Sequence, residues 1–319
     1  MHSSTSNFEL KIRLSRVVPP APVILLAVMA ALLAMFEFGT RTVIEHRSKV
    51  QSMVNREYTG AIQIRRPGIP GGSSFKQLLV VGNSLVGHGI DLDELRKGLP
   101  PEWQASRFWI YNTGYTDWHF GLRRLFADGS RPNTVAVVFA AMRWWSTGIR
   151  GDYSSQYVFQ TRDLPQIASE ANLDKTETSG LFLARYSKFY ALRSDIRKVL
   201  LDSLMPDLPR MYDLFKPGSS RRFTDQELIP LFAERIKTYR TIVETYGSKL
   251  ILIVPPVPRP GEEHQQAIRI AARNAGVQVV MPMSCSDVPA TDFLDDVHLT
   301  PEGAKLYTAQ VVKQLPPVL

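Results

Sequence analysis

Cysteine is almost absent from this sequence: Cys285 is the only one in 319 residues, so no intramolecular disulfide can form. No CxxC pair or cysteine–histidine cluster is present either, and nothing indicates a structural metal site. The net charge of +8 would suit an anionic partner such as a membrane surface, an acidic polymer or a nucleic acid. However, no helix-turn-helix, zinc-finger or aromatic RNA-binding motif accompanies the charge, so nucleic acid is not an expected partner. A content of 44% hydrophobic and 21% charged residues excludes a disordered protein and allows one large domain or two small ones.

Charge is also absent from Val17 to Phe36, a run about as long as the roughly 20 residues that a bilayer requires. The run predicts a transmembrane anchor over residues 17–38, preceded by a cytoplasmic tail over residues 1–16. The alternative is a cleaved signal peptide, but no clear small-x-small cleavage site precedes Glu37, which favours an uncleaved anchor. Basic residues flank the run on both sides and do not decide its orientation. Since a short basic tail before a first apolar helix usually stays inside, we expect the following domain to be exported.

After the anchor, residues 39–74 predict a juxtamembrane stalk, helical over Thr40 to Tyr58, and a Pro/Gly/Ser linker over Arg66 to Ser74. The catalytic domain is expected over residues 75–319, with a helical, basic insertion at about 151–222 that serves as a cap or faces the membrane. Apolar runs that alternate with helical stretches predict a mostly parallel sheet with helices on both faces. The expected strands are Gln77 to Val81, Phe108 to Asn112, Thr134 to Phe139, Lys249 to Val254 and Val277 to Met281.

Two short motifs about two hundred residues apart supply a complete Ser/His/Asp set. Gly82-Asn83-Ser84 directly follows the first predicted strand, where open α/β sheets place their ligand sites. Asp295-Asp296-Val297-His298 precedes the last predicted helix. A hydroxyl made nucleophilic by a base, with a carboxylate that orients the base, is the set that covalent acyl transfer needs. The alternatives are a plain helix N-cap at Ser84 and an Asx-turn at Asp295, with Asp296 as a competing orienting residue.

These motifs, together with Asn112-Thr113-Gly114 after the second predicted strand, resemble the blocks of the SGNH/GDSL hydrolase superfamily in their order and spacing. With the N-terminal anchor added, the chain is most similar to the membrane-tethered bacterial acyltransferases and esterases of that superfamily, which include alginate acetylation proteins. The resemblance implies a flavodoxin-like three-layer α/β/α sandwich, no cofactor and an acyl-serine intermediate. It further implies a bacterial inner-membrane location, with the catalytic domain on the periplasmic side and a multi-spanning membrane acyltransferase as partner.

The resemblance also implies roles for individual residues. Ser84 is the nucleophile, His298 the general base and Asp295 its orienting carboxylate, while the N–H groups of Ser84 and Gly114 stabilise the oxyanion. Asn112 belongs to the same block as Gly114 and is expected beside the substrate. In two places the chain departs from the pattern: Asn83 replaces the usual aspartate, and Ala140 to Trp145 replaces a Gly-x-Asn-Asp block.

The second departure removes an oxyanion donor, and our hypothesis is that Arg143 replaces it. Trp144 and Trp145 either stack on sugar rings at the mouth of the site or pack inside the protein. His88 and His119 are expected to be structural or substrate-positioning residues and not metal ligands.

The expected function is serine-dependent transfer of an acyl group, most simply acetyl, to a cell-surface polysaccharide, or its removal. Transferase and esterase share the acyl-Ser84 intermediate and differ in whether a sugar hydroxyl or water takes the acyl group. Two alternatives are a lysophospholipase or thioesterase that acts on lipid, and a non-catalytic glycan-binding or scaffold protein.

Overall fold

The computed structural model describes residues 21–47, 49–204, 223–258 and 264–319. Its centre is a five-stranded, fully parallel sheet with the strand order β2-β1-β3-β4-β5. The strands are β1 Lys76–Gly82, β2 Trp103–Trp109, β3 Thr134–Val138, β4 Lys249–Ile253 and β5 Gln278–Val280. This is the doubly wound, flavodoxin-like order, whose topological switch point lies between β1 and β3.

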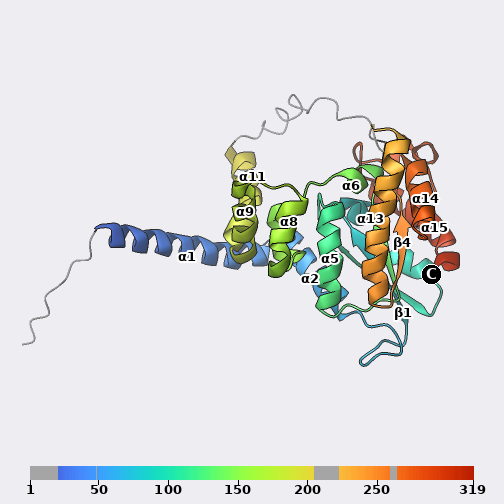
Figure 1. The fold of residues 1–319 in the computed structure, drawn as a ribbon, viewed down its shortest axis with the longest axis horizontal. Helices are drawn as coiled ribbons and strands as arrows, with labels where there is room; N and C mark the ends of the chain where they lie inside the picture. Colours follow the sequence, from blue (N-terminus) through green and yellow to red (C-terminus); the bar gives the residue numbers. More distant parts are fainter. Residues whose placement is uncertain (1–20, 48, 205–222, 259–263) are drawn as a thin grey trace, which may run out of the picture.

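Helices cover both faces of the sheet, as the alternation of its buried side chains requires. In β1, Leu79 and Val81 belong to a core that also includes side chains of α5, α13 and α14. Leu78 and Val80 belong to a second core, formed with α3, α4 and α15. The fold is therefore the predicted three-layer α/β/α sandwich (Figure 1). These helices are α3 Ser84–Gly89, α4 Leu92–Gly98, α5 Tyr115–Ala127, α13 Asp225–Thr245, α14 Gln265–Asn274 and α15 Pro301–Gln314.

Several helix ends follow from local sequence signals. Thr224 caps α13 in a reciprocal capping box with Glu227, a pairing typical of the Thr-x-x-Glu spacing. Thr300 caps α15, with Pro301 at its first position. Gly247 follows α13 with φ +71°, a conformation that glycine adopts without steric cost.

The N-terminal region differs from the predicted anchor and stalk. The first helix, α1 Ala21–Arg47, continues well beyond residue 38, and its segment Ala21–Thr42 is long and apolar enough to cross a membrane. The next helix, α2 Lys49–Gln63, packs against β2, and its side chains Val54 and Ala61 are buried in the main core. The residues of α2 therefore belong to the domain instead of forming a separate stalk.

The second strand also differs from its prediction. It ends at Trp109, and Asn112 lies beyond it with a positive φ of +58°. The strand lies at the edge of the sheet, where polar residues such as Gln104 and Arg107 are tolerated and weaken the apolar signal.

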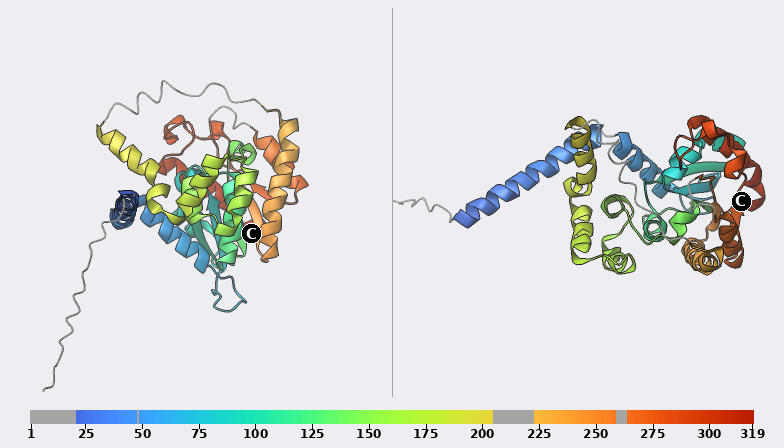
Figure 2. Two further views of the ribbon diagram at one scale, coloured as in Figure 1. Left: turned by 60° about the vertical axis from the view of Figure 1, so that its left-hand side comes forward. Right: turned by 90° about the horizontal axis from the view of Figure 1, so that it is seen from above.

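Helices fill the long connection between β3 and β4. A short helix, α6 Ala141–Trp145, follows β3 directly and leads into further helices on the side of the domain from which α1 leaves (Figures 1 and 2). These are α7 Gly151–Tyr157, α8 Leu164–Glu170, α9 Lys175–Tyr186, α10 Lys188–Ala191 and α11 Arg193–Leu204. The last part of the predicted insertion, residues 205–222, lies outside the described residues.

Candidate active site

Ser84 lies at the carboxyl end of β1, at the switch point of the sheet. The strand ends at Gly82, where a Cβ atom would approach the carbonyl oxygen of Val138 to 2.5 Å, so that only glycine fits. Asn83 then caps α3, because its side-chain oxygen accepts a hydrogen bond from the N–H of Leu85 at 2.9 Å. The chain thus turns sharply from strand to helix, and Ser84 becomes the first residue of α3.

The structure brings Ser84, His298 and Asp295 together in one hydrogen-bonded chain. Ser84 Oγ lies 2.8 Å from His298 Nε2, across a sequence separation of 214 residues. On the other side of the ring, His298 Nδ1 lies 2.8 Å from Asp295 Oδ2. This is the order of contacts in which an imidazole can take a proton from a serine hydroxyl while a carboxylate stabilises the resulting cation.

Asp295 is fixed by the turn that carries it. Its Oδ1 accepts hydrogen bonds from the N–H groups of Val297 and His298, at 2.8 and 2.7 Å. Burial raises the pKa of Asp295, but the hydrogen bonds from the side chain and backbone of His298 outweigh this and leave the pKa below its usual value. From the sequence, the Asx-turn at Asp295 and its orienting role were alternatives. In the structure Asp295 does both, because it forms the turn and also contacts the ring of His298.

The asparagine at position 83 has a structural reason. Its amide Nδ2 donates to the carbonyl oxygen of Thr113 at 3.2 Å, while its oxygen caps α3. An ionised aspartate can only accept hydrogen bonds and could not make both contacts. Asn83 thereby ties the Ser84 turn to the Asn112–Gly114 segment.

The predicted oxyanion donor Gly114 is not available in this structure. Its N–H donates to Asp117 Oδ2 at 2.9 Å, so the predicted role of this N–H needs a correction. Asp117 is fully buried, and its other oxygen accepts hydrogen bonds from Ser154 Oγ and from the N–H of Arg150 at 3.0 Å. The N–H of Ser84 lies at the first position of α3, where backbone N–H groups have no partner within the helix.

Asp117 was missed by the sequence reasoning, although a signal for it exists. It occupies the third position of α5, where an acidic side chain commonly reaches back to the N-cap N–H. Burial raises its pKa to about 6, against the opposing hydrogen bonds from Ser154 and the backbone.

Arg143 and Asn112 form a pair next to this segment. Arg143 Nη2 donates to Asn112 Oδ1 at 2.8 Å. The Cδ of Arg143 would lie 4.0 Å from a Cβ atom placed on Gly114, so the side chain runs past the start of α5. The side chain of Arg143, which belongs to α6, is therefore close to the Asn112–Gly114 segment.

Trp144 is not at the mouth of the site. It is 1% exposed and packs against Phe139 and Tyr239, with ring centroids 5.6 and 5.4 Å away. Trp145 is partly buried and packs against Phe223 and Phe232. The packing alternative therefore holds for Trp144, and the sugar-stacking role predicted for it is wrong.

Of the two histidines that were considered from the sequence besides His298, His88 lies in the site, whereas His119 contacts residues elsewhere. The ring of His88 lies 4.8 Å from that of His298, between centroids, and 6.3 Å from Trp109. Burial lowers the pKa of His88, and the neighbouring His298 lowers it further. His119 instead lies 3.5 Å from Glu170. Among the described residues, no group of three or more His, Cys, Asp or Glu side chains is placed to hold a metal ion.

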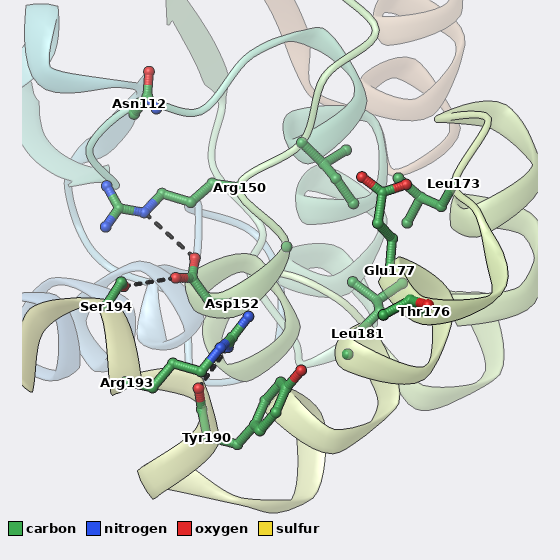
Figure 3. A pocket seen from close by; sticks show the side chains of 13 residues that line it. Asn112, Arg150, Asp152, Leu173, Thr176, Glu177, Leu181, Tyr190, Arg193 and Ser194 are labelled. Atoms are coloured by element: carbon green, nitrogen blue, oxygen red, sulfur yellow. Dashed lines mark hydrogen bonds and ion pairs between the residues drawn. The ribbon is translucent and has the colours of Figure 1, made fainter. Parts of the chain in front are cut away.

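A cavity of about 610 Å³ opens beside Asn112, between the sheet edge and the helices of the connection (Figure 3). Arg150 lies on the same side as Asn112, while Glu177, Tyr190 and Arg193 come from α9, α10 and α11. Arg150 pairs with Asp152 at 3.7 Å, and Ser194 Oγ donates to the other oxygen of Asp152. Most of the lining side chains are polar, with Ile149, Leu173 and Leu181 as the apolar part.

Comparison with known proteins finds only distant likeness. No family model and no curated protein matches the chain. Among solved structures, it is similar to LAE5, an alpha/beta hydrolase enzyme from the metagenome of Lake Arreo, Spain, with 11% identity and a TM-score of 0.38. That match covers 75% of this chain and 94% of the other.

It is also similar to two catalytic mutants of Axe2, an acetylxylan esterase from Geobacillus stearothermophilus. The identities are 12% and 11%, each with a TM-score of 0.36 and with 75% of this chain and 93% of the other covered. The function proposed below therefore rests on the contacts within this chain.

Proposed function

We propose that this protein is a membrane-anchored serine enzyme that transfers an acyl group, most simply acetyl, from an ester donor to a polysaccharide hydroxyl through an acyl-Ser84 intermediate. The observation that carries the proposal is the continuous chain of contacts from Ser84 Oγ to His298 Nε2 and from His298 Nδ1 to Asp295. Acyl transfer needs a carboxylate, an imidazole and a hydroxyl in this order, whereas capping of a helix does not.

The proposed reaction follows from these contacts. His298 Nε2 takes the proton of Ser84 as Oγ attacks the ester carbonyl, and it returns that proton to the leaving oxygen as the ester bond breaks. The acceptor hydroxyl then gives its proton to His298 and attacks the acyl-Ser84 carbonyl, which releases Ser84 and forms the new ester. If water is the acceptor, the same steps give hydrolysis. The low pKa of Asp295 keeps its carboxylate ionised, so that it stabilises the imidazolium in both steps.

The cavity beside Asn112 is lined by polar side chains, although Ser84, His298 and Asp295 are not part of its lining. Side chains such as Thr176, Tyr190 and Ser194 offer hydrogen bonds that a sugar can use, whereas a long acyl chain would need a continuous apolar wall. For an acceptor that extends past Asn112 into this cavity, the lining fits a polysaccharide better than a lysophospholipid. The two substrate classes, polysaccharide and lysophospholipid, can be compared in one experiment, because each can be offered to the same acyl-enzyme.

Contacts of α1 at Phe36 and Glu37 support an anchor that is retained and not cleaved. Phe36 stacks on Phe189, with ring centroids 5.1 Å apart, and Glu37 accepts a hydrogen bond from Ser187 Oγ at 2.8 Å. Cleavage before Glu37 would remove Phe36, and with it the stacking contact on Phe189, from the folded domain. We propose a single-pass protein of the bacterial inner membrane with the catalytic domain on the periplasmic side, as expected from the short basic tail before α1.

The direct test is intact-mass spectrometry of the full chain in detergent, after incubation with an activated acetyl ester or a fluorophosphonate. We expect one covalent adduct per chain, which Ser84→Ala abolishes while a folded control such as Ser73→Ala retains it. Candidate acidic and neutral glycans, or lysophospholipid, are then added to the acetyl-enzyme. Loss of the adduct with a matching gain on the glycan indicates transfer. Absence of any adduct on a folded chain would refute the acyl-serine proposal and favour a binding or scaffold protein.

Arg143 is proposed to stabilise the oxyanion in place of the missing asparagine, together with the N–H of Ser84. The engagement of the Gly114 N–H by Asp117 makes a further donor necessary. Arg143→Ala should reduce the rate of Ser84 acylation about 100-fold, and Arg143→Lys should restore part of it. An unchanged acylation rate in folded Arg143→Ala would exclude this role.

A further inference from the structure

Helix α1 is fixed at Phe36 and Glu37, about ten residues before its end, to the helices of the connection between β3 and β4 by both polar and apolar contacts. The carboxylate of Glu37 accepts hydrogen bonds from Ser187 Oγ and from the N–H groups of Lys188 and Phe189, at 2.8, 3.0 and 3.1 Å. Phe36, one residue earlier, stacks on Phe189 with an angle of 21° between the ring planes. The start of α10 is therefore held at a defined height along α1.

That height corresponds to the edge of the hydrocarbon region. The described part of α1 is uncharged from Ala21 to Phe36, which at 1.5 Å per residue is about 24 Å of the roughly 30 Å that the region measures. Glu37 and Arg41, which pair at 2.8 Å, are the first charged residues after this stretch. With α1 in a bilayer, α10 thus lies at the level of the lipid headgroups.

The helices attached there run across the axis of α1. In Figures 1 and 2, α9 and α11 stand transverse to α1, on the side of the domain from which it leaves. If α1 crosses the membrane, these helices lie roughly in the membrane plane, with the catalytic sheet behind them. This is the orientation in which one face of a helix can rest on a lipid surface.

The free face of α9 has the residues for such a contact. Leu181 and Ala184 are buried against neighbouring helices, whereas Leu183 and Tyr186 are 51% and 67% exposed. At about 100° per residue, Leu183 and Tyr186 lie on the face opposite to the buried pair, away from the catalytic domain. Tyrosine and leucine are residues that enter the interface between headgroups and acyl chains. Leu204, at the end of α11, is 77% exposed as well.

We propose that α9, α10 and α11 form a second membrane contact, in which Leu183 and Tyr186 enter the phospholipid surface next to α1. This inference rests on the proposed anchor. Its consequence is that the domain has one fixed orientation, with the cavity beside Asn112 walled by the same helices that touch the lipid. A substrate in that cavity is then within one helix thickness of the membrane surface.

The test places a single fluorescent label on the full chain in lipid nanodiscs. In a Cys285→Ser background, Leu183→Cys and Tyr186→Cys each receive an environment-sensitive fluorophore. Lipids with a nitroxide on the headgroup serve as quenchers for these positions, and lipids with a nitroxide near the end of the acyl chain serve as quenchers for a label at the bilayer centre. Lys305→Cys, on the exposed side of α15, is the matched control, and Val28→Cys reports on α1 itself. We expect labels at 183 and 186 to lose about half of their fluorescence, while the label at 305 keeps it.

Two results would overturn the proposal, and they differ. Quenching at position 28 without quenching at 183 and 186 would refute the second contact and leave the anchor intact. Absence of quenching at all three positions would refute the anchor and the contact together. Neither result bears on the acyl-Ser84 test, which uses protein in detergent. A Glu37→Ala variant adds a further check, since loss of its hydrogen bonds should weaken the quenching at 186 and leave that at 28 unchanged.

Discussion

The buried carboxylate of Asp117 should make the stability of this protein depend on pH in a way that one substitution removes. Burial raises its pKa from 3.8 to about 6, so between these values the folded state binds a proton that the unfolded state has released. Stability is therefore highest below the unfolded pKa, falls as the pH rises towards 6, and is constant above that. Near pH 7 the ionised carboxylate is maintained at a cost in stability.

The size of the effect follows from the shift. A difference of about 2 pKa units corresponds to about 3 kcal/mol, of which about 2 kcal/mol falls between pH 4.5 and 7.5. Asp117→Asn removes this contribution because the amide does not ionise. The amide also leaves one of the N–H donors of Gly114 and Arg150 facing another donor, at an additional cost of about 1–3 kcal/mol that does not depend on pH.

The assay is urea unfolding of the full chain in detergent, followed by tryptophan fluorescence at several pH values from 4.5 to 7.5. The difference in unfolding free energy between the original protein and Asp117→Asn should change by about 2 kcal/mol over this range, in favour of the variant at the higher pH. The control is Asp93→Asn, because the side chain of Asp93 is 84% exposed and its removal should leave the slope unaltered. Parallel pH profiles for the original protein and Asp117→Asn would refute the reasoning.

The remaining predictions concern the site and the N-terminal region. Asp295→Asn should lower the rate of Ser84 acylation about 10³- to 10⁴-fold. The free energy of unfolding should change little, since the side chain of Asp295 is 48% exposed. If thermal unfolding showed a loss of stability large enough to explain the slower acylation, the orienting role would be contradicted. Trp144→Ala should lower the free energy of unfolding by about 3–5 kcal/mol, because the side chain is buried. Folded Trp144→Phe should have a KM for a glycan acceptor within about twofold of that of the original protein. A larger rise in KM would favour the stacking role. A chain that begins at Phe75 should be less stable than one that begins at residue 49, by several kcal/mol in urea unfolding, because Val54, Ala61 and Ile64 are buried in the core; equal stability would restore the stalk interpretation.

The layered fold and the Ser84–His298–Asp295 set were predictable because their signals are local. Strand β1 is an uninterrupted apolar run, Thr224 and Thr300 are ordinary N-caps, and the two motifs each occupy a few consecutive residues. That the motifs meet follows from the parallel sheet, whose carboxyl ends lie at one edge.

What the sequence did not reveal depends on long-range packing. The helix α2 mixes apolar residues with polar and charged ones, and its tertiary contacts, most of them with β2, make it part of the core. Trp144 follows a strand, as a residue at a site would, but the helix α6 turns its ring towards Tyr239. The N–H of Gly114 looked free because its partner, Asp117, is one of many acidic residues at the start of a helix.

Two of these differences, the burial of Trp144 and the occupied N–H of Gly114, involve the segment that follows β3. The family resemblance predicts an asparagine there that would donate to the oxyanion, but this chain forms α6 and continues into the helices that reach α1. The same segment brings Arg150 and Ser154 onto Asp117, which in turn engages the Gly114 N–H. One oxyanion donor is therefore missing and a second is occupied, while the chain gains a cavity wall and the attachment to α1. In the proposed mechanism, the oxyanion is then stabilised by the N–H of Ser84 and by a cation such as Arg143, so the Arg143 variants test this mechanism more severely than any change in the triad.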